Sequence, residues 1–331
     1  FCVPEGGAHD NHVSRYFTVV DGLVVQIKVP DLVPPALPRG LIANPPGWVP
    51  TNTFTLTWEN PPDPSGITGA YLKLGDAPDQ NGDGVLHAGE TVSQATGIQV
   101  PGPGAYSAYV WLEDGAGNAD PANAASTLLR YDPDPPGSPQ NLVANGATES
   151  TGDWSQSDTF TLTWTNPTEV SGVLTACYQL GESPLATAAS ESCQTEPNLA
   201  SLTGIRVPGN GRHPVYVWLA DAAGNVDPAS AVSTTLLYDA LPPVSVASAP
   251  AVAEETPIRV SWVATDTHSG VASVALWVKA GENELWQPSG LTAAADGPGF
   301  FLYEPSGPGI YQFATIATDQ AANREAEPTG G

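Results

Sequence analysis

Residues 79–90 (DQNGDGVLHAGE) place oxygen donors at the alternating positions that surround a calcium ion. The expected ligands are Asp79, Asn81, Asp83, the carbonyl of Val85, a water molecule near His87, and a bidentate Glu90. Gly84 is expected to make the sharp turn between them. Because Ca²⁺ is a hard cation that prefers oxygen ligands, this spacing predicts a calcium site.

All twelve positions resemble the calcium loop of EF-hands and dockerins, with the apolar Leu86 in its usual place. The flanks differ from those families, because residues 70–74 (AYLKL) and 90–93 (ETVS) are typical of strands and not of paired helices. We therefore expect the ion to stiffen a loop and not to act as a signal. The alternative is a hairpin loop rich in Asn-Gly and Asp-Gly that binds no ion.

The three cysteines of the chain predict one local disulfide. Cys177 and Cys193 lie within one repeat, and a bond between them places the protein outside the reducing cytosol. They align with the two ends of the excursion that holds residues 79–90 in the preceding repeat. Cys2 is left without a partner in the same chain.

Other groups of reactive side chains have simpler explanations. His9 and His12 could bind a transition metal, but two histidines near a chain end rarely have a function. An acidic residue followed by Ser-Gly recurs at 63–66 (DPSG), 169–172 (EVSG) and 266–270 (DTHSG), where turn chemistry accounts for it. Since no catalytic triad, recurrent carboxylate pair or phosphate loop stands out, we do not expect an enzyme.

These groups belong to a tandem repeat. Residues 109–118 (YVWLEDGAGN) and 216–225 (YVWLADAAGN) are near copies, and 316–323 (IATDQAAN) is a looser third copy. Each begins with residues that favour a strand and ends with residues that tolerate a tight turn. Both faces of the first two strands are apolar. One face is expected to cover the core of its own domain, and the other needs a neighbouring domain, a subunit or a flat ligand, or stays exposed.

A second landmark lies upstream of each turn, at residues 54–58 (FTLTW), 160–164 (FTLTW) and 258–262 (IRVSW). Apolar and polar residues alternate, as in an antiparallel sheet with one buried face. The spacing of these segments is that of one β-sandwich. The predicted class is all-β: three tandem immunoglobulin-like β-sandwiches after an N-terminal β segment. The expected ranges are 1–30, 31–134, 135–241 and 242–331.

The two ends of the chain do not match. Residues 15–20 and 23–29 flank an Asp-Gly dipeptide and predict a hairpin, and the second run precedes Pro-Pro as the last strand of a repeat does. The third repeat stops before its last strand. We expect the N-terminal segment to complete the third repeat of a neighbouring subunit, which gives head-to-tail assembly. The residues assigned to this contact are Leu23, Val25, Ile27, Val29 and, for an intersubunit bond, Cys2. The alternative is a segment of a longer repeat protein.

Composition restricts the partners. The 331 residues include 34 Pro, 34 Gly and 35 Asp+Glu against 10 Lys+Arg, for a formal net charge of −25. Such a surface repels phosphate backbones, so nucleic acid is not an expected partner, and it suits divalent cations. No apolar run approaches the ~18 residues that span a bilayer, so we expect no membrane insertion. Because the chain has no Met, either a leader was removed or the sequence is a fragment.

Together, these strands, turns and Pro-Pro joints resemble the tandem immunoglobulin-like or fibronectin-type-III-like domains of prokaryotic cell-surface proteins, over about residues 31–323. The resemblance implies an extracellular structural protein at the cell surface: a subunit of a filament, pilus-like fibre or surface layer made of identical subunits. It also implies an alternative, a spacer or carbohydrate-binding region of a secreted polysaccharide-active or adhesin protein. In that case Trp111, Trp218 or Trp286 would stack on surface glycans.

Overall fold

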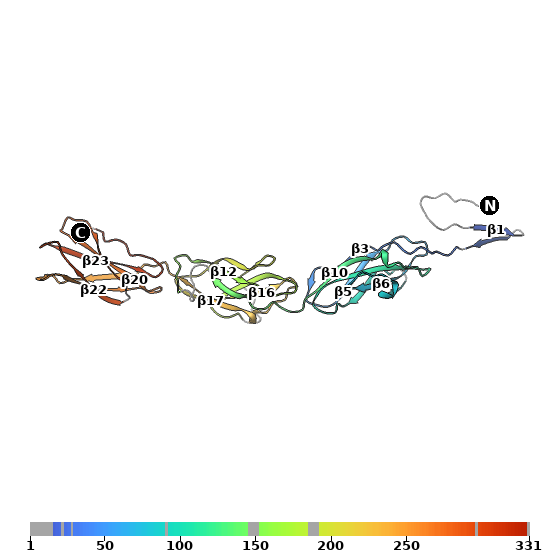
Figure 1. Cartoon of the computed structure of the whole chain (residues 1–331), viewed down its shortest axis with the longest axis horizontal. Helices are drawn as coiled ribbons and strands as arrows, with labels where there is room; N and C mark the ends of the chain where they lie inside the picture. Colours follow the sequence, from blue (N-terminus) through green and yellow to red (C-terminus); the bar gives the residue numbers. More distant parts are fainter. Residues whose placement is uncertain are drawn as a thin grey trace. The chain divides into compact units, whose positions relative to one another are not determined.

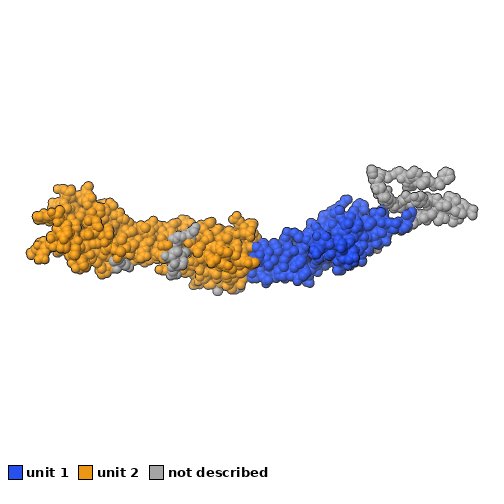
Figure 2. Space-filling view, viewed as in Figure 1, with its two compact units in different colours: residues 1–135, 169–172, 221–225 blue, residues 136–168, 173–220, 226–331 orange. Residues whose placement is uncertain are grey.

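The computed structural model describes residues 16–20, 23–27, 29–89, 92–144, 152–184, 192–294 and 297–329, with side chains from residue 29 onward. The described chain is all-β, with three short 3₁₀ helices, as predicted (Figure 1). It forms two compact units (Figure 2), one of residues 1–135, 169–172 and 221–225, and one of residues 136–168, 173–220 and 226–331.

An N-terminal hairpin precedes the repeats. β1 (Tyr16–Val20) pairs antiparallel with β2 (Leu23–Ile27), with Val20 opposite Leu23. The Asp-Gly dipeptide between them predicts this hairpin, and the prediction is confirmed for the backbone. The side chains of Leu23, Val25 and Ile27 lie outside the described residues, as does Cys2. Val29 is 41% exposed.

The first repeat is a sandwich of two sheets, with strand orders β3-β5-β8 and β4-β10-β9-β6-β7. The strands are β3 (Arg39–Asn44), β4 (Trp48–Val49), β5 (Phe54–Glu59), β6 (Ile67–Leu74), β7 (Val85–Ala88), β8 (Gln94–Ile98), β9 (Gly104–Asp114) and β10 (Ala125–Tyr131). Phe54, Leu56 and Trp58 of β5 are buried in turn, and they meet Val110 and Leu112 of β9 in one core. The predicted alternation along β5 is confirmed.

The second repeat has the orders β11-β12-β15 and β14-β13-β16-β17. Its strands are β11 (Gln140–Ala144), β12 (Thr159–Thr165), β13 (Val173–Leu180), β14 (Ser192–Thr195), β15 (Ser201–Arg206), β16 (Gly211–Asp221) and β17 (Val232–Tyr238). Its core again joins both sheets, with Phe160 and Leu162 of β12 against Val217 and Leu219 of β16.

The third repeat has the orders β18-β19-β22 and β21-β20-β23. Its strands are β18 (Val244–Ser248), β19 (Ile258–Thr265), β20 (Val271–Ala280), β21 (Gln287–Ala293), β22 (Gly297–Tyr303) and β23 (Tyr311–Asp319). Val260 and Trp262 of β19 share a core with Leu276 of β20 and Ala317 of β23.

The third repeat differs from the others at one sheet edge. β9 lies between β6 and β10, and β16 lies between β13 and β17, whereas β23 pairs only with β20 among the described strands. β10 pairs with residues 104–110 of β9, and β17 pairs with residues 211–217 of β16. Asp114, Asp221 and Asp319 are equivalent residues at the ends of these strands. The residues that lie at the same positions before Asp319 are 309–315.

Candidate functional site

The loop of the first repeat that was predicted to bind calcium is partly a strand. The 3₁₀ turn η1 (Asn81–Asp83) leads directly into β7, whose Val85 lies opposite Leu72 of β6. The strand predicted over 90–93 is wrong at residues 92 and 93, which are outside any strand. Residues 85–88 take up the backbone hydrogen-bonding groups at this edge of β6. The edge therefore offers no strand partner to residues 92 and 93. Glu90 lies outside the described residues.

Asn81 holds this loop against the sheet. Its side-chain oxygen accepts a hydrogen bond from the indole Nε1 of Trp111 at 3.0 Å, and its amide nitrogen donates to the carbonyl of Ala119 at 3.0 Å. Trp111 is fully buried and stacks on Tyr71, with ring centroids 5.2 Å apart. The second apolar face of β9 is therefore covered by a loop of the same repeat. From the sequence, Asn81 was predicted only as a metal ligand, and this second role was missed.

Gly84 does not make a sharp turn, so that expectation is wrong. Its φ of −108° and ψ of 160° are extended values that any residue adopts. Glycine is required there for another reason: a Cβ would overlap the Trp111 ring, with Cζ2 at 2.9 Å and the Leu72 carbonyl oxygen at 3.2 Å. The loop approaches the indole this closely only because residue 84 has no side chain.

The acidic residues of the loop interact with each other and with a lysine. Lys73 Nζ lies 3.3 Å from Asp83 Oδ2, which also accepts the Asp79 N–H at 3.1 Å. The hydrogen bond from the Asp79 N–H lowers the pKa of Asp83, and the side chains of Asp79 and Lys73 lower it further. The hydrogen bond with Asp83 raises the pKa of Asp79. Among the described residues, Asp79, Asp83 and His87 do not gather three ligand atoms within 4.8 Å of one another. Calcium binding here stays a prediction.

The disulfide of the second repeat is confirmed. Cys177 of β13 lies directly opposite Cys193 of β14, with Cα atoms 4.1 Å apart and the sulfur atoms bonded. The bond fastens the edge strand β14 to the sheet. In the first repeat, β7 occupies the corresponding edge without a covalent link.

The repeated turn at the end of β9, β16 and β23 has one arrangement in all three repeats. Asp114 accepts the N–H of Ala116 and of Asn118, and the Asn118 side-chain amide at 2.7 Å. Burial opposes ionisation of Asp114, but the hydrogen bonds from Asn118 more than compensate and lower its pKa. The same amide donates to the backbone carbonyl of Asp31 at 3.0 Å.

The other two turns repeat this second hydrogen bond. Asn225 donates to the carbonyl of Asp132 at 2.8 Å, and Asn323 donates to the carbonyl of Asp239 at 2.9 Å. Each acceptor belongs to the segment that leads into the repeat. The sequence predicts the tight turn but not this tether. Its only signal is that an aspartate recurs in each segment, close before a Pro-Pro pair.

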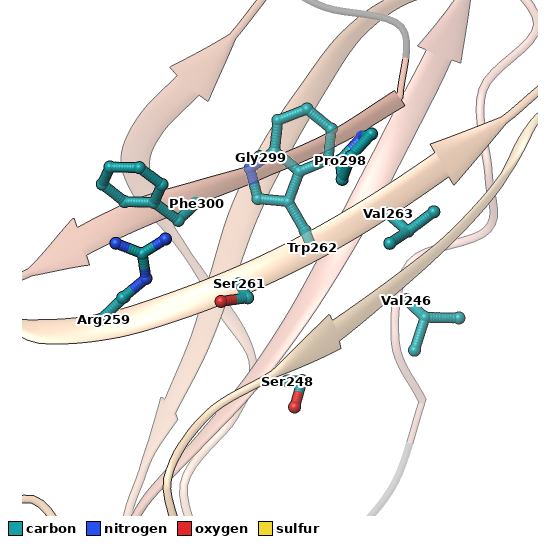
Figure 3. Close-up of a pocket in the computed structure, with 9 residues that line it drawn as sticks. All are labelled: Val246, Ser248, Arg259, Ser261, Trp262, Val263, Pro298, Gly299 and Phe300. Carbon is teal, nitrogen blue, oxygen red and sulfur yellow. The ribbon is translucent and has the colours of Figure 1, made fainter.

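An open depression lies on the outer side of the β18-β19-β22 sheet (Figure 3). Its volume is about 400 Å³, and its lining is largely apolar, with Val246, Val263 and Phe300 exposed at its surface. The Arg259 guanidinium lies over the Phe300 ring, 3.7 Å from its centroid. Arg259 is the only ionisable residue of this lining, which supplies no pair of groups for acid-base chemistry.

Comparisons with known proteins find similarity only to solved structures. No family model matches the chain, and no curated protein matches it. Among solved structures, the chain is similar to the FN1–FN3 domains of chicken CNTN1, with 13% sequence identity, a TM-score of 0.26, and coverage of 88% of this chain and 96% of that chain. At so low a TM-score, the assignment of immunoglobulin-like sandwiches rests on the sheets and cores described above.

No helix among the described residues is long and apolar enough to cross a membrane.

Replacing Gly84 by Ala should release the loop from Trp111. The added Cβ cannot share space with the indole ring and the Leu72 carbonyl, so the ring should gain solvent contact and its fluorescence should shift to longer wavelength. Gly82→Ala is the matched control, because no atom lies within 4 Å of its Cβ. Identical spectra for both variants would contradict the packing described here.

Removing the disulfide should destabilise the second repeat. Closing a loop with a sequence separation of 16 restricts the unfolded chain, by about 3 kcal/mol in the entropy model. Reductant should speed amide exchange in β13 and β14 of the wild type, measured by mass spectrometry, and should leave Cys177→Ser/Cys193→Ser unchanged. Equal protection of the wild type with and without reductant would refute this role.

Proposed function

We propose that the chain is an extracellular structural protein, a subunit of a cell-surface filament, pilus-like fibre or surface layer. The observation that carries this proposal is the Asn tether, which holds the segment before each repeat in the same way three times. These hydrogen bonds hold the segment before each repeat in place, which is a structural role. The disulfide supports a location outside the reducing cytosol.

One edge of β23 has no partner among the described strands, and this supports assembly by strand addition. Glu325 already takes part of this edge: its carboxylate accepts the Ala317 N–H at 2.6 Å, and its backbone N–H donates to the Ala317 carbonyl. The remaining stretch, 309–315, is the one that β10 and β17 cover in the other repeats. In the proposal, a neighbouring subunit covers it with the hairpin segment that carries Leu23, Val25, Ile27 and Val29. A following segment of a longer chain is the alternative source of that strand.

A glycan-binding or spacer role is the second candidate. The burial of Trp111 and Trp218, at 0% and 1% exposure, speaks against stacking of either indole on a sugar. Trp286 is half-buried and is the remaining candidate of the three. We therefore place structural assembly first and surface glycans second.

Calcium in the loop of residues 79–90 forms part of the proposal. An ion bound by Asp79, Asp83 and the carboxylate of Glu90 would fasten β7 to the edge of the first repeat, where the second repeat has its disulfide. The proposed role is to stiffen this edge. In the same proposal, the loop is of the EF-hand and dockerin type, and the chain is a surface protein of a prokaryote.

Deletion of residues 1–29 tests the assembly. The full chain should form linear polymers in negative-stain electron microscopy, and the deletion should give monomers whose β23 amides exchange faster, because 309–315 then lack a partner strand. Deletion of residues 1–15 retains β1 and β2 and is the control for loss of chain length. Polymers that survive the longer deletion would defeat strand donation, whereas glycan-array binding lost in Trp286→Ala would favour the second candidate.

A further inference from the structure

Acidic side chains converge three at a time at one place in each repeat. One comes from the segment before the repeat: Asp31, Asp132 or Asp239. One comes from the loop before β6, β13 or β20: Asp63, Glu169 or Asp266. One comes from the Asn-capped turn: Asp114, Asp221 or Asp319. In each group, three carboxylate oxygens, one from each residue, lie within 4.8 Å of one another.

These groups are largely removed from water. The turn aspartates are at most 2% exposed, and so are Asp132 and Asp239. The loop acid is half-buried in each group, and in the first group Asp31 is half-buried too, so solvent reaches the carboxylates from the side of these residues. Carboxylates are rarely buried unless a positive charge or hydrogen bonds compensate them.

The compensation that the structure shows comes from neutral donors. Asp239 Oδ2 accepts the Ser269 N–H, Asp266 Oδ1 accepts the N–H of Gly270, and Asp319 accepts both donors of Asn323. In the second repeat, Asp132 accepts the Ser171 N–H, whereas in the first repeat the Ser65 N–H goes to the loop acid Asp63. The turn aspartates of both repeats again accept the N–H of the following Asn. The ion pairs Lys73–Asp83, Arg206–Asp158 and Arg324–Glu327 do not involve these carboxylates. Three like charges thus lie together in each group, and none of these ion pairs compensates them.

A second observation comes from the hydroxyl groups of the same loops. Ser269 is only 7% exposed, and its Oγ has no hydrogen-bond partner. The Oγ of the equivalent Ser171 is also buried without a partner, as is one carboxylate oxygen of Asp31. In the first repeat, the equivalent Ser65 Oγ lies 3.0 Å from Asp63 Oδ1, so the hydroxyl at this position contacts the loop acid there.

Turn chemistry alone does not explain these atoms. Asx and Ser turns account for the N–H groups that the loop acids bind, but they leave the buried oxygens of Asp31, Ser171 and Ser269 unused. Buried polar atoms without partners are rare, and three of the five in the described residues belong to this one place in the repeat. A bound cation that is coordinated by oxygen atoms would give them a partner.

We propose that each of the three groups is a calcium site, formed by the segment acid, the loop acid with its serine, and the turn aspartate. Two oxygens that each lie about 2.4 Å from one calcium ion are at most about 4.8 Å apart, and the three oxygens of each group lie within 4.8 Å of one another. Ca²⁺ takes carboxylate, hydroxyl and water oxygens together, and its charge replaces the missing cationic side chain. The ion joins the segment before each repeat to two loops of that repeat.

The loop acids are the residues to change, because they are half-buried and lie outside the cores. The full chain is stripped with EDTA, and bound calcium is counted by native mass spectrometry and by calorimetric titration with CaCl₂. Asp63→Asn, Glu169→Gln and Asp266→Asn should each lose one ion, and the triple variant should lose three. Glu59→Gln, an exposed acid outside the groups, is the control and should lose none. An ion that remains in the triple variant and disappears with Asp79→Asn/Glu90→Gln belongs to residues 79–90.

Stability separates a cation site from a purely structural turn. With EDTA, the triple variant should melt at a higher temperature than the wild type, because three negative charges are removed; with CaCl₂ the order should reverse. A turn role alone predicts the same loss in both solutions. Unchanged ion counts in all three single variants, or the same melting order with EDTA and CaCl₂, would overturn the proposal. Equal affinity for MgCl₂ would overturn its assignment to calcium.

Discussion

The organisation of each repeat depends on the hydrogen bonds between the buried aspartate of its turn and the asparagine that follows it. A carboxylate is stable at 1% exposure only if donors replace its water, and Asn118 supplies two of them to Asp114, from its backbone and its side chain. The side-chain amide of Asn118 has a second hydrogen, which it donates to the carbonyl of Asp31. One Asp–Asn pair therefore closes a turn and fixes the segment that enters the repeat.

The same structural problem is solved in two ways on the outer edge of the first two repeats. In both, a strand is added to the edge of the sheet: β7 next to β6, and β14 next to β13. The second repeat holds this strand with a disulfide. The first repeat uses Asn81, which binds a buried indole, and Gly84, whose missing side chain lets the loop reach that indole. The order of the strands at this edge is the same in both repeats, and only the contacts that hold the edge strand differ.

Much of the fold could be predicted because its causes are local. Alternation along residues 54–58 marks a strand with one buried face, and Asp-Gly after Val20 marks a hairpin. The disulfide followed from the alignment of Cys177 and Cys193 with an excursion of the neighbouring repeat. Among the described strands, β23 pairs only with β20, which agrees with the prediction from the first two repeats of where a further strand would lie.

The rest depended on contacts between distant segments. Asp63 looks like the start of an ordinary turn, and only the fold brings it near Asp31 and Asp114. The spacing of oxygen donors at 79–90 points to a metal, but Asn81 also meets Trp111, thirty positions away. The extended backbone at Gly84 shows that a glycine can serve close approach where a turn was expected.

Amide hydrogen exchange of Asn323→Ala tests most directly whether the tether fixes the segment before a repeat. This side chain binds both Asp319 and the carbonyl of Asp239, whereas Asn283 is exposed, so Asn283→Ala is the control. We predict faster exchange at residues 239–241 and 266–270 as well as in the turn itself, with no change in the control. Faster exchange confined to residues 319–323 would show that the Asn only closes its own turn, and would contradict the account.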